Sequence, residues 1–416
     1  PPAAPAAPAA APAAAPAAPA GPLWATPPIS SSWQEYFGVP LEAPLDARTL
    51  LRLQLSGGDL SVGSSVTGGM SFAQDLAKQD LGVSVLRLLG PTHRLHGGVG
   101  LERTQGGMQG TVADGYGLAA SALDYDAARI GAFVEDTWQP GEAVSLRYGV
   151  RVDRSSWSGE QAVSPRASLE IRPRKGLTLR GAAGRFVQFP RQEQIFLAAG
   201  EPLRRQAADH LIAGIEKSWG AGLRLVVEAY RKDMKDPIGE AVNRSIELPE
   251  LLTRYDRGRV RWAEITLEQA AAGSWKWGFT YGHLVATQEK DGVETPRNAD
   301  QRHTASLFLG KRFGRGWEAG GVFRYASGLP YTPVLPFTSG FAYGTALEEV
   351  NSGRLPAYHR LDLRLSRLVP VAWGRLGVHV DLLNVYNRAN VRSVDLYFEP
   401  AAGAYYRTTA YQSPFL

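Results

Sequence analysis

The stretch from Arg354 to Asn390 alternates apolar and polar residues in two arms, and this pattern constrains the fold more than any other part of the sequence. In each arm leucine or valine occupies one face, and mostly polar residues or glycine occupy the other. The residues are Leu361, Leu363 and Leu365 against Asp362, Arg364 and Ser366, then Leu376, Val378, Val380 and Leu382 against Gly377, His379, Asp381 and Leu383. A period of two predicts strands. The connection, which contains Pro370 and Gly374, predicts an antiparallel hairpin.

Each arm has about ten alternating residues, more than the roughly five or six of an ordinary globular strand. That length is what a tilted strand needs to cross a bilayer. In lipid every backbone N–H and C=O must be paired within the protein, so a membrane hairpin requires a closed barrel. We therefore expect the rest of the chain to supply further strands.

The composition of the 416 residues is compatible with such a barrel. The sequence contains no run of roughly 18 apolar residues, which excludes helical membrane spans. Hydrophobic residues make up 44% of the chain and the mean hydropathy is −0.20. A barrel gives similar values because its strands alternate lipid-facing and lumen-facing residues.

The charge of the chain is slightly basic. Lys and Arg total 45 against 40 Asp and Glu, so the net charge is +5 and the pI is near 9.3. A basic chain can bind nucleic acid, but here the basic residues are scattered singly without a basic tract. We therefore expect a solvated lumen and no nucleic-acid partner. The absence of cysteine excludes disulfides and thiolate metal sites, and it suits an oxidising periplasm or cell surface.

The first 46 residues differ from the remainder. Residues 1–22 are almost entirely Pro and Ala, and such frequent proline favours a polyproline or disordered spacer over a helix. This stretch lacks the charged start and unbroken apolar core of a signal peptide. Because the chain begins with Pro instead of Met, we expect it to be processed or a fragment. Residues 23–46 are expected to form an irregular loop, and residues 47–416 the barrel region.

From about Ala47 one unit recurs: strand, short turn, strand, long loop. The short turns contain Gly, Pro and Asp, which tight turns require. They are predicted at 57–59, 90–92, 139–142, 173–176, 220–222, 272–274 and 314–316, and the long connections at 104–127, 155–163, 187–205, 233–257, 288–301 and 327–357. Short turns on one rim and long loops on the other are typical of a bacterial outer-membrane barrel whose long loops face outward. The region to Tyr386 holds about eight hairpins, or about sixteen strands.

Seven fragments, in this order, resemble the barrel of TonB-dependent outer-membrane receptors. They are Ser164–Leu169, Gly184–Phe186 with Phe189 and Pro190, His210–Glu216 with Glu228–Tyr230, Asn298–Thr304, Ser327–Pro333, Arg360–Arg364 and Leu383–Arg388. The resemblance covers most of residues 47–416. It implies an all-β fold, a transmembrane antiparallel β-barrel like the plugged barrels of about 22 strands.

The sequence departs from that family in three places. Trp262 stands where the family usually has Gly, and no plug domain or TonB-box segment can be recognised before Ala47. The chain stops at Leu416, where the family continues into a last strand that ends in an aromatic residue. Both ends of the counted region point to the loop side, whereas a complete barrel has both termini in the periplasm. We therefore expect an incomplete barrel that lacks the plug and the last strand.

No motif for catalysis or for metal binding is present. The sequence contains no nucleophile elbow, phosphate-binding glycine loop, dinucleotide fingerprint or zinc-ligand pair. His93 and His96 should point to different faces of a strand, which disfavours a metal pair. We expect no enzyme activity, no catalytic residues, no cofactor and no metal.

Two groups of aromatic residues are candidates for contacts outside the protein. The first alternates along one predicted strand and is expected to face lipid, where amphipathic rings are favoured near the interface. Its members are Trp275, Trp277, Phe279 and Tyr281. The second lies on or near a long loop and is the candidate for ligand contact. Its members are Trp317, Tyr325, Tyr331 and Phe337.

Several polar residues near the loops are expected to have structural roles. The spacing of Asp300, Arg302 and Asp362 suits a polar network in the lumen. His303 and His359 are expected to hydrogen-bond with neighbouring strand carboxylates or loop carbonyls instead of contacting ligand.

The resemblance implies a receptor of the bacterial outer membrane that imports a scarce nutrient, such as an iron chelate, cobalamin or an oligosaccharide. Its expected partners are outer-membrane lipids, a small-molecule or oligosaccharide ligand and, for the full-length parent, the TonB complex that acts on the plug. A passive porin-like channel or surface-binding barrel of about sixteen strands is the alternative. A soluble secreted β-protein used for adhesion is a third reading. The ligand itself is not predictable, because the loops that recognise it vary most freely.

Overall fold

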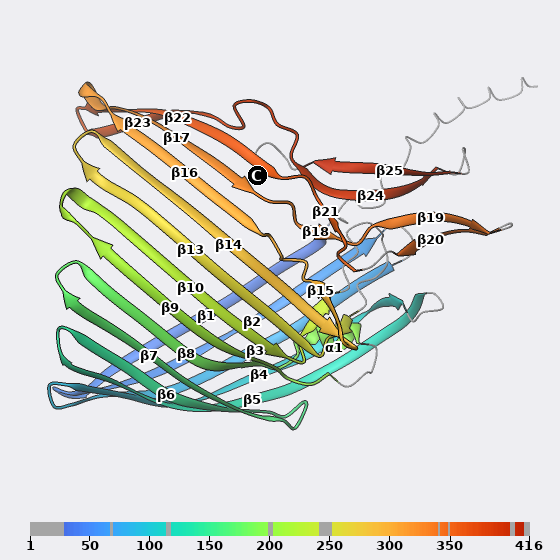
Figure 1. The fold of residues 1–416 in the computed structure, drawn as a ribbon. Helices are drawn as coiled ribbons and strands as arrows, with labels where there is room; N and C mark the ends of the chain where they lie inside the picture. The colour runs from blue at the N-terminus through green and yellow to red at the C-terminus, as the bar shows by residue number, and fades with distance from the viewer. Residues whose placement is uncertain are drawn as a thin grey trace, which may run out of the picture.

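The computed structural model describes residues 29–66, 70–113, 118–198, 203–240, 252–339, 342–347, 350–399 and 404–411, and nearly all of them lie in strands (Figure 1). Ten long strands come first: β1 (Ile29–Asp46), β2 (Thr49–Val66), β3 (Met70–Leu89), β4 (His93–Ala113), β5 (Leu118–Gly141), β6 (Val144–Ser155), β7 (Gln161–Arg174), β8 (Leu177–Gln188), β9 (Gln206–Ser218) and β10 (Leu223–Lys235). Six more follow: β13 (Arg257–Ala272), β14 (Trp275–Lys290), β16 (His303–Arg312), β17 (Trp317–Ala326), β22 (Tyr358–Val371) and β23 (Gly374–Leu382).

Short elements occupy the turns, the connections and the end of the described chain. They are α1 (Gln192–Leu197), η1 (Gly220–Gly222), β11 (Ile238–Glu240), β12 (Leu252–Arg254), β15 (Val293–Pro296), η2 (Gly314–Gly316), β18 (Pro330–Tyr331), β19 (Val334–Ser339), β20 (Ala342–Leu347), β21 (Gly353–Arg354), β24 (Val391–Glu399) and β25 (Ala404–Tyr411). No helix among the described residues is long and apolar enough to cross a membrane.

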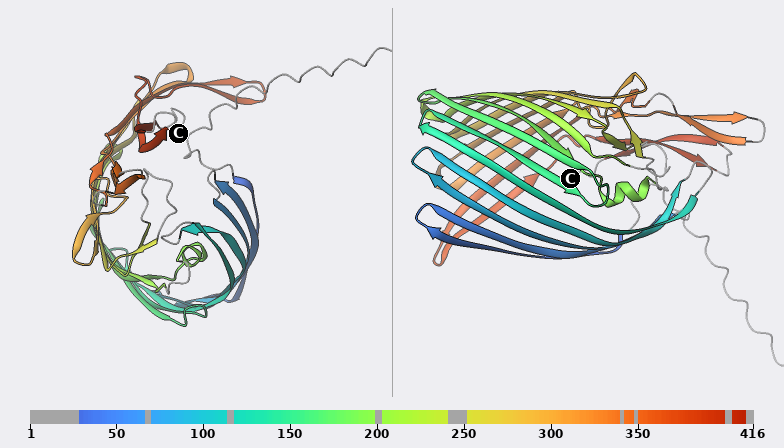
Figure 2. Two further views of the ribbon diagram at one scale, coloured as in Figure 1. Left: turned by 90° about the vertical axis from the view of Figure 1, so that its right-hand side faces the viewer. Right: turned by 90° about the horizontal axis from the view of Figure 1, so that it is seen from below.

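Each long strand pairs with the preceding long strand in antiparallel fashion, from β1 to β23. With the short β15 they form one sheet of 17 strands. Figure 2 shows this sheet end-on as a ring that is open on one side. Within the described residues the outer edges of β1 and β23 pair with no other strand, so the sheet is not closed. The predicted all-β antiparallel architecture, with sixteen long strands, is confirmed.

Short turns lie at one rim of the sheet and long connections at the other, as the sequence predicted (Figure 1). Glycines in the left-handed region form several of the short turns, for example Gly176 (φ 70°) and Gly316 (φ 79°). A Cβ on Gly316 would overlap the carbonyl oxygen of Leu368, so this turn requires glycine for its space as well as for its φ.

The structure corrects the prediction of an irregular loop over residues 23–46. Strand β1 occupies 18 of these positions and pairs with β2 along its length. The strand contains Pro40 and Pro44, although proline cannot donate to a β-ladder. Both prolines are tolerated here because β1 is the edge strand of the described sheet. The predicted spacer at 1–22 lies outside the described residues.

Two predicted interruptions are continuous strand. Gly57, Gly58 and Asp59 were expected to form a turn but lie in the middle of β2. A Cβ on Gly57 would lie 3.2 Å from the ring of Phe37 and 3.0 Å from the Lys78 carbonyl oxygen, so glycine here makes room for a neighbouring ring. The predicted loop at 104–127 is mostly a hairpin extension, in which β4 and β5 remain paired as far as Ala113 and Leu118.

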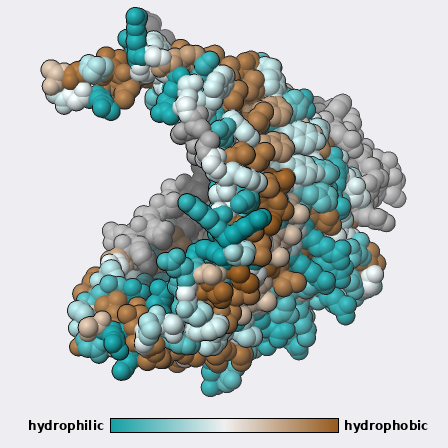
Figure 3. Space-filling model, turned by 60° about the vertical axis from the view of Figure 1, so that its left-hand side comes forward, coloured by the Kyte–Doolittle hydropathy of each residue, from teal (hydrophilic) through white to brown (hydrophobic). Residues whose placement is uncertain are grey.

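Alternation along the strands gives the sheet two chemically different faces. On one face, Phe279, Leu307, Phe323 and Leu361 are successive register partners on four adjacent strands. The side chain of Leu307 is 46% exposed although it is fully apolar. Figure 3 shows such residues as a brown band that curves around the outside of the sheet beside its hollow interior. We call this the outer face, and the opposite one the lumen face.

Helix α1 packs on the lumen face near the long-loop rim, inside the ring of strands (Figure 2). Phe196 of α1 is buried against Met108 of β4, with Leu123 of β5 beside them. This is the hydrophobic cluster of the described residues. A single-layer sheet needs little more, because its remaining apolar side chains face outward.

Candidate functional site

Ion pairs run across the lumen face from strand to strand. Arg180 donates to Glu170 (3.0 Å) and to Glu216 (2.8 Å). Arg224 in turn donates to Glu216 (3.0 Å) and to Glu268 (2.9 Å). Each arginine therefore joins carboxylates on both neighbouring strands, which links β7 to β13 by side chains as well as by the backbone ladder.

The second half of the sheet continues this pattern. Arg324 donates to Asp362 (2.9 Å), which also accepts from Arg360 (2.6 Å). Arg364 binds Asp381 at 2.5 and 2.8 Å. The polar network that the sequence predicted around Asp362 is therefore present, and it faces the lumen.

Two carboxylates interrupt this charge balance. Glu228 of β10 and Glu264 of β13 are direct register partners on the lumen face, and neither forms an ion pair with another described residue. Above them, toward the long loops, the rings of Tyr230 and Trp262 lie 5.4 Å apart. Trp262, which stands where the resembling family usually has Gly, packs over Gly282. A Cβ on Gly282 would lie 3.0 Å from the indole Nε1.

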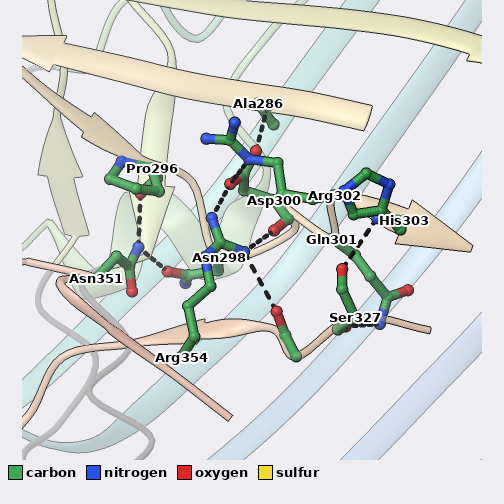
Figure 4. A network of polar contacts seen from close by, with 11 residues as sticks. Ala286, Pro296, Asn298, Asp300, Gln301, Arg302, His303, Ser327, Asn351 and Arg354 are labelled. Carbon is green, nitrogen blue, oxygen red and sulfur yellow. Dashed lines mark hydrogen bonds and ion pairs between the residues drawn. The ribbon is translucent and has the colours of Figure 1, made fainter. Parts of the chain in front are cut away.

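At the mouth of the barrel, the end that carries the long connections, Asp300 fills a gap in the β-ladder. Strand β14 changes partner from β15 to β16, and the chain leaves the sheet between those strands. There the carboxylate of Asp300 accepts the backbone N–H of Ala286 (2.6 Å). It also accepts from Arg302 Nε (2.7 Å) and from Arg354. Figure 4 shows both guanidinium groups converging on this carboxylate, which is fully buried.

Arg354 ties the loop between β17 and β22 to this carboxylate. Its Nη1 donates to the carbonyl oxygens of Asp300 (2.6 Å) and Gly328 (3.2 Å). Nearby, Asn351 donates to the carbonyl of Pro296 and to Asn298, both at 2.8 Å. The two loops are therefore joined to each other and to the rim of the barrel (Figure 4). We call this group of contacts the Asp300 latch.

A close backbone approach explains the glycine in the motif Ser327–Pro333. A Cβ on Gly328 would overlap the carbonyl oxygen of Leu355, and the Leu355 N–H donates to Leu329 (2.9 Å).

We expect Gly328→Ala to separate these two backbone segments, at a cost of about 1–3 kcal/mol or more, as for an overpacked interior. Limited proteolysis of the folded protein should then cut within residues 327–357 faster than in the wild type. Gly181→Ala is the matched control, because a Cβ there meets nothing within 4 Å. Equal cleavage of both variants would contradict the close approach.

The predicted ligand-contacting aromatics do not gather in one place. Trp317 begins β17 directly after the short turn η2, at the rim opposite the long loops, which corrects the prediction that it lies on or near a long loop. Tyr325 shares the outer face with Phe323. Tyr331 does lie in the mouth, where its ring covers Gly353. Phe337 lies in β19, and its side chain is outside the described part.

The aromatics predicted to face lipid share the outer face of β14. Trp275, Phe279 and Tyr281 are exposed, and Trp277 is half-buried. Trp277 Nε1 donates to Gln269 (2.8 Å) on the neighbouring strand. Their contact with lipid stays a prediction.

The histidines hydrogen-bond to tyrosines, where carboxylates or carbonyls were expected. His303 Nδ1 lies 2.8 Å from the Tyr281 hydroxyl, and His359 Nδ1 lies 2.8 Å from that of Tyr386. His93 and His96 point to opposite faces as predicted: His93 binds Asp136 (2.6 Å), whereas His96 packs against a lumen ring. Among the described residues no group of three His, Asp or Glu side chains is placed to hold a metal ion.

A curled antiparallel sheet with an apolar outer face and an ion-paired lumen is the architecture of membrane-spanning β-barrels. Residues 30–387 match the family described as TonB dependent receptor-like, beta-barrel. The chain belongs to this family, as the sequence fragments suggested.

Solved structures share the fold at low sequence identity. The copper transporter OprC has a TM-score of 0.66 and 15% identity over 87% of this chain and 61% of its own. The outer membrane transporter YddB from Escherichia coli has a TM-score of 0.66 and 12% identity over 91% of this chain and 62% of its own. The siderophore receptor PiuA from Acinetobacter baumannii has a TM-score of 0.63, 12% identity and the same coverage, 91% and 62%. This chain therefore spans about three fifths of the length of these structures. No curated protein sequence matches it.

Proposed function

We propose that this chain forms the barrel of an active transporter in the bacterial outer membrane. It takes up a scarce nutrient, such as an iron chelate, cobalamin or an oligosaccharide, with energy from the TonB complex. The observation that carries this proposal is the pairing of an apolar outer face with a charged lumen in a chain of the TonB-dependent receptor family. The transporters of similar fold support it.

Aromatic residues at both rims support the position in the membrane. At the short-turn rim, Lys311 lies 4.5 Å from the ring centroid of Trp275, and Arg367 lies 5.0 Å from that of Trp317. An indole with a nearby cation suits the headgroup level of a bilayer. At the other rim of the outer face lie the tyrosine–histidine pairs described above. The apolar band lies between these two belts, as expected for lipid tails.

The charges on the lumen wall favour a plug domain that occupies the lumen. Glu228 and Glu264 place two like charges side by side on the wall, which is unfavourable unless a cation neutralises them. A plug carrying a basic residue would do so when it occupies the lumen. Ligand contact is proposed for the mouth, where Tyr331 and Phe337 belong to the same connection between β17 and β22 as Arg354 of the Asp300 latch.

A passive pore of sixteen strands is the second candidate, because β1 and β23 run in opposite directions and are the two free edges of the described sheet. The absence of native cysteine permits a direct test by disulfide crosslinking. One cysteine is introduced in β1, at Leu41 or Ala43, and a second in β23, at Leu376 or Val378. The two should fail to crosslink in the native membrane protein if the further strands of a larger, plug-bearing barrel separate these edges. A disulfide requires Cα atoms within about 7 Å. Efficient crosslinking would therefore establish a closed sixteen-stranded pore and overturn the transporter proposal.

Conductance in planar bilayers gives an independent prediction. The native protein should be nearly silent if its lumen is plugged, whereas an open barrel of about sixteen strands should conduct ions continuously. Stable, large conductance without any added denaturant would favour the pore.

A further inference from the structure

The mouth of the lumen holds two cations that lie close together. Lys232 is on the lumen face of β10, opposite Val260. Arg297 follows β15, and its side chain reaches the same part of the wall: Nη1 lies 3.0 Å from the position of a Cβ on Gly258. Gly258 is the register partner of Met234, one lumen-face position above Lys232. Glycine at 258 therefore leaves room for a guanidinium group beside the lysine.

Neither cation has a carboxylate partner among the described residues. Asp233, the acidic residue next to Lys232 in sequence, lies on the outer face, where it accepts from Arg231 (2.6 Å) and lies 3.5 Å from Arg259. The carboxylate of Asp300 also lies at the mouth, but it is already paired with Arg302 and Arg354. The unpaired carboxylates of the wall, Glu228 and Glu264, lie deeper, beyond the aromatic pair of Tyr230 and Trp262. This separates a cationic mouth from an acidic lower wall.

The arginine is also poorly solvated. Arg297 Nη1 is buried and makes no hydrogen bond to a described residue. The same Cβ position on Gly258 lies 2.6 Å from the methyl group of Met234 and 3.4 Å from the ring of Pro237, so the space around this nitrogen is partly apolar. Burial lowers the pKa of Arg297 below its ordinary value, and it raises the pKa of the neighbouring Tyr255 hydroxyl. A buried charge without a counterion is costly, and an anion bound at this position would relieve that cost for both cations.

We propose that Lys232 and Arg297 form a binding site for the carboxylate or phosphate group of a small molecule that enters the barrel from the loop side. This rests on the proposed transport function and gives its substrate an anionic class. A carboxylate or a phosphate suits the pair, since a guanidinium binds such groups with two parallel hydrogen bonds and an ammonium adds a point charge. The acidic pair below repels the same group, so the anion is held at the mouth.

The test uses the native protein purified in detergent, with citrate as the carboxylate probe and inorganic phosphate as the phosphate probe. Isothermal titration calorimetry should show saturable binding of at least one probe. Lys232→Gln and Arg297→Gln should each weaken this binding about tenfold or more, because each removes a charge-assisted contact. Arg147→Gln is the matched control: Arg147 is a lumen-side arginine of β6 that also forms no ion pair with a described residue. It should leave the affinity unchanged.

Two results would overturn the site. One is the absence of saturable binding of both probes to the wild type. The other is an equal loss of affinity in all three variants, which would mean general attraction to a positive lumen. Heat-dependent mobility in detergent gels should show that each variant remains a folded barrel. The crosslinking test of the transport function is independent of this binding test. If the protein crosslinks as a closed pore and still binds citrate, the transporter proposal is rejected and the anion site stands. If the protein does not crosslink and binds neither probe, the anion site is rejected and the transporter proposal stands.

Discussion

Asp300→Asn is expected to detach the loops at the mouth from the barrel rim at a cost of about 3–5 kcal/mol. The carboxylate is fully buried and accepts from the Ala286 backbone, Arg302 and Arg354. Asparagine keeps one acceptor oxygen, but its NH₂ group must then face a guanidinium. The substitution removes the negative charge and leaves two arginines facing each other without a counterion. Hydrogen exchange at the backbone of residues 327–329 and 353–355 should accelerate strongly, while the strands remain protected.

Asp209→Asn is the control for this experiment. Asp209 also pairs with an arginine, Arg185, through two hydrogen bonds of 2.7 and 2.9 Å, but both side chains are more than half exposed. An exposed pair of this kind contributes at most about 1 kcal/mol. If the two variants lose equal stability, the Asp300 latch is no stronger than a surface ion pair. A double-mutant cycle with Arg354→Gln separates the direct contact from the rest of the network.

The alternation of residues predicted the sheet well because a period of two reflects a local property of the backbone. The arm from Leu361 to Leu365 shows this: its leucines face outward, and its charged residues face the lumen. The residue types typical of tight turns located most of the short turns for the same reason. A glycine with positive φ, such as Gly176, is required by the backbone geometry of the turn itself, which involves only two or three neighbouring residues.

The errors arose where a residue serves a distant neighbour. Gly57 resembles a turn residue, but its space is taken by the ring of Phe37 on the adjacent strand. Pro40 argues against a strand unless the strand is known to lie at an edge. The error at Trp317 has another cause: this residue directly follows the predicted short turn at 314–316, which by itself places it at the rim opposite the long loops.

The candidate site was predictable only in part. The spacing of Asp300 and Arg302 suggested a polar network, and the two residues form an ion pair within one short segment. Arg354 lies 54 residues further along the chain, and only the fold brings it to the same carboxylate. Nothing in the sequence singled out Arg297, because its distinguishing feature is a buried Nη1 without a hydrogen-bond partner among the described residues, which only the fold reveals.

Leu307→Arg is expected to destabilise the membrane-inserted barrel by about 2–4 kcal/mol, the cost of an arginine at the bilayer midplane. Leu307 lies four residues from His303 and four from Lys311, which belong to the two belts at the rims of the outer face. Four residues span roughly 13 Å along a strand, or about 10 Å of depth at a tilt near 40°. Leu307 is therefore near the centre of the band, whereas Trp277 lies only two residues from Trp275 of the short-turn belt.

The matched control is Thr280→Arg, which adds the same side chain to the lumen face of the adjoining strand. Thr280 pairs with Thr266, which is flanked on that face by Glu264 and Glu268, so an arginine there gains nearby carboxylates and stays in a polar environment. Its effect should be close to zero when both variants are unfolded from lipid vesicles by denaturant. If Leu307→Arg costs no more than Thr280→Arg, the outer face does not contact lipid tails. The ion-paired lumen face cannot contact lipid instead, because burying charge in lipid is too costly, so this result would overturn the membrane-spanning barrel itself.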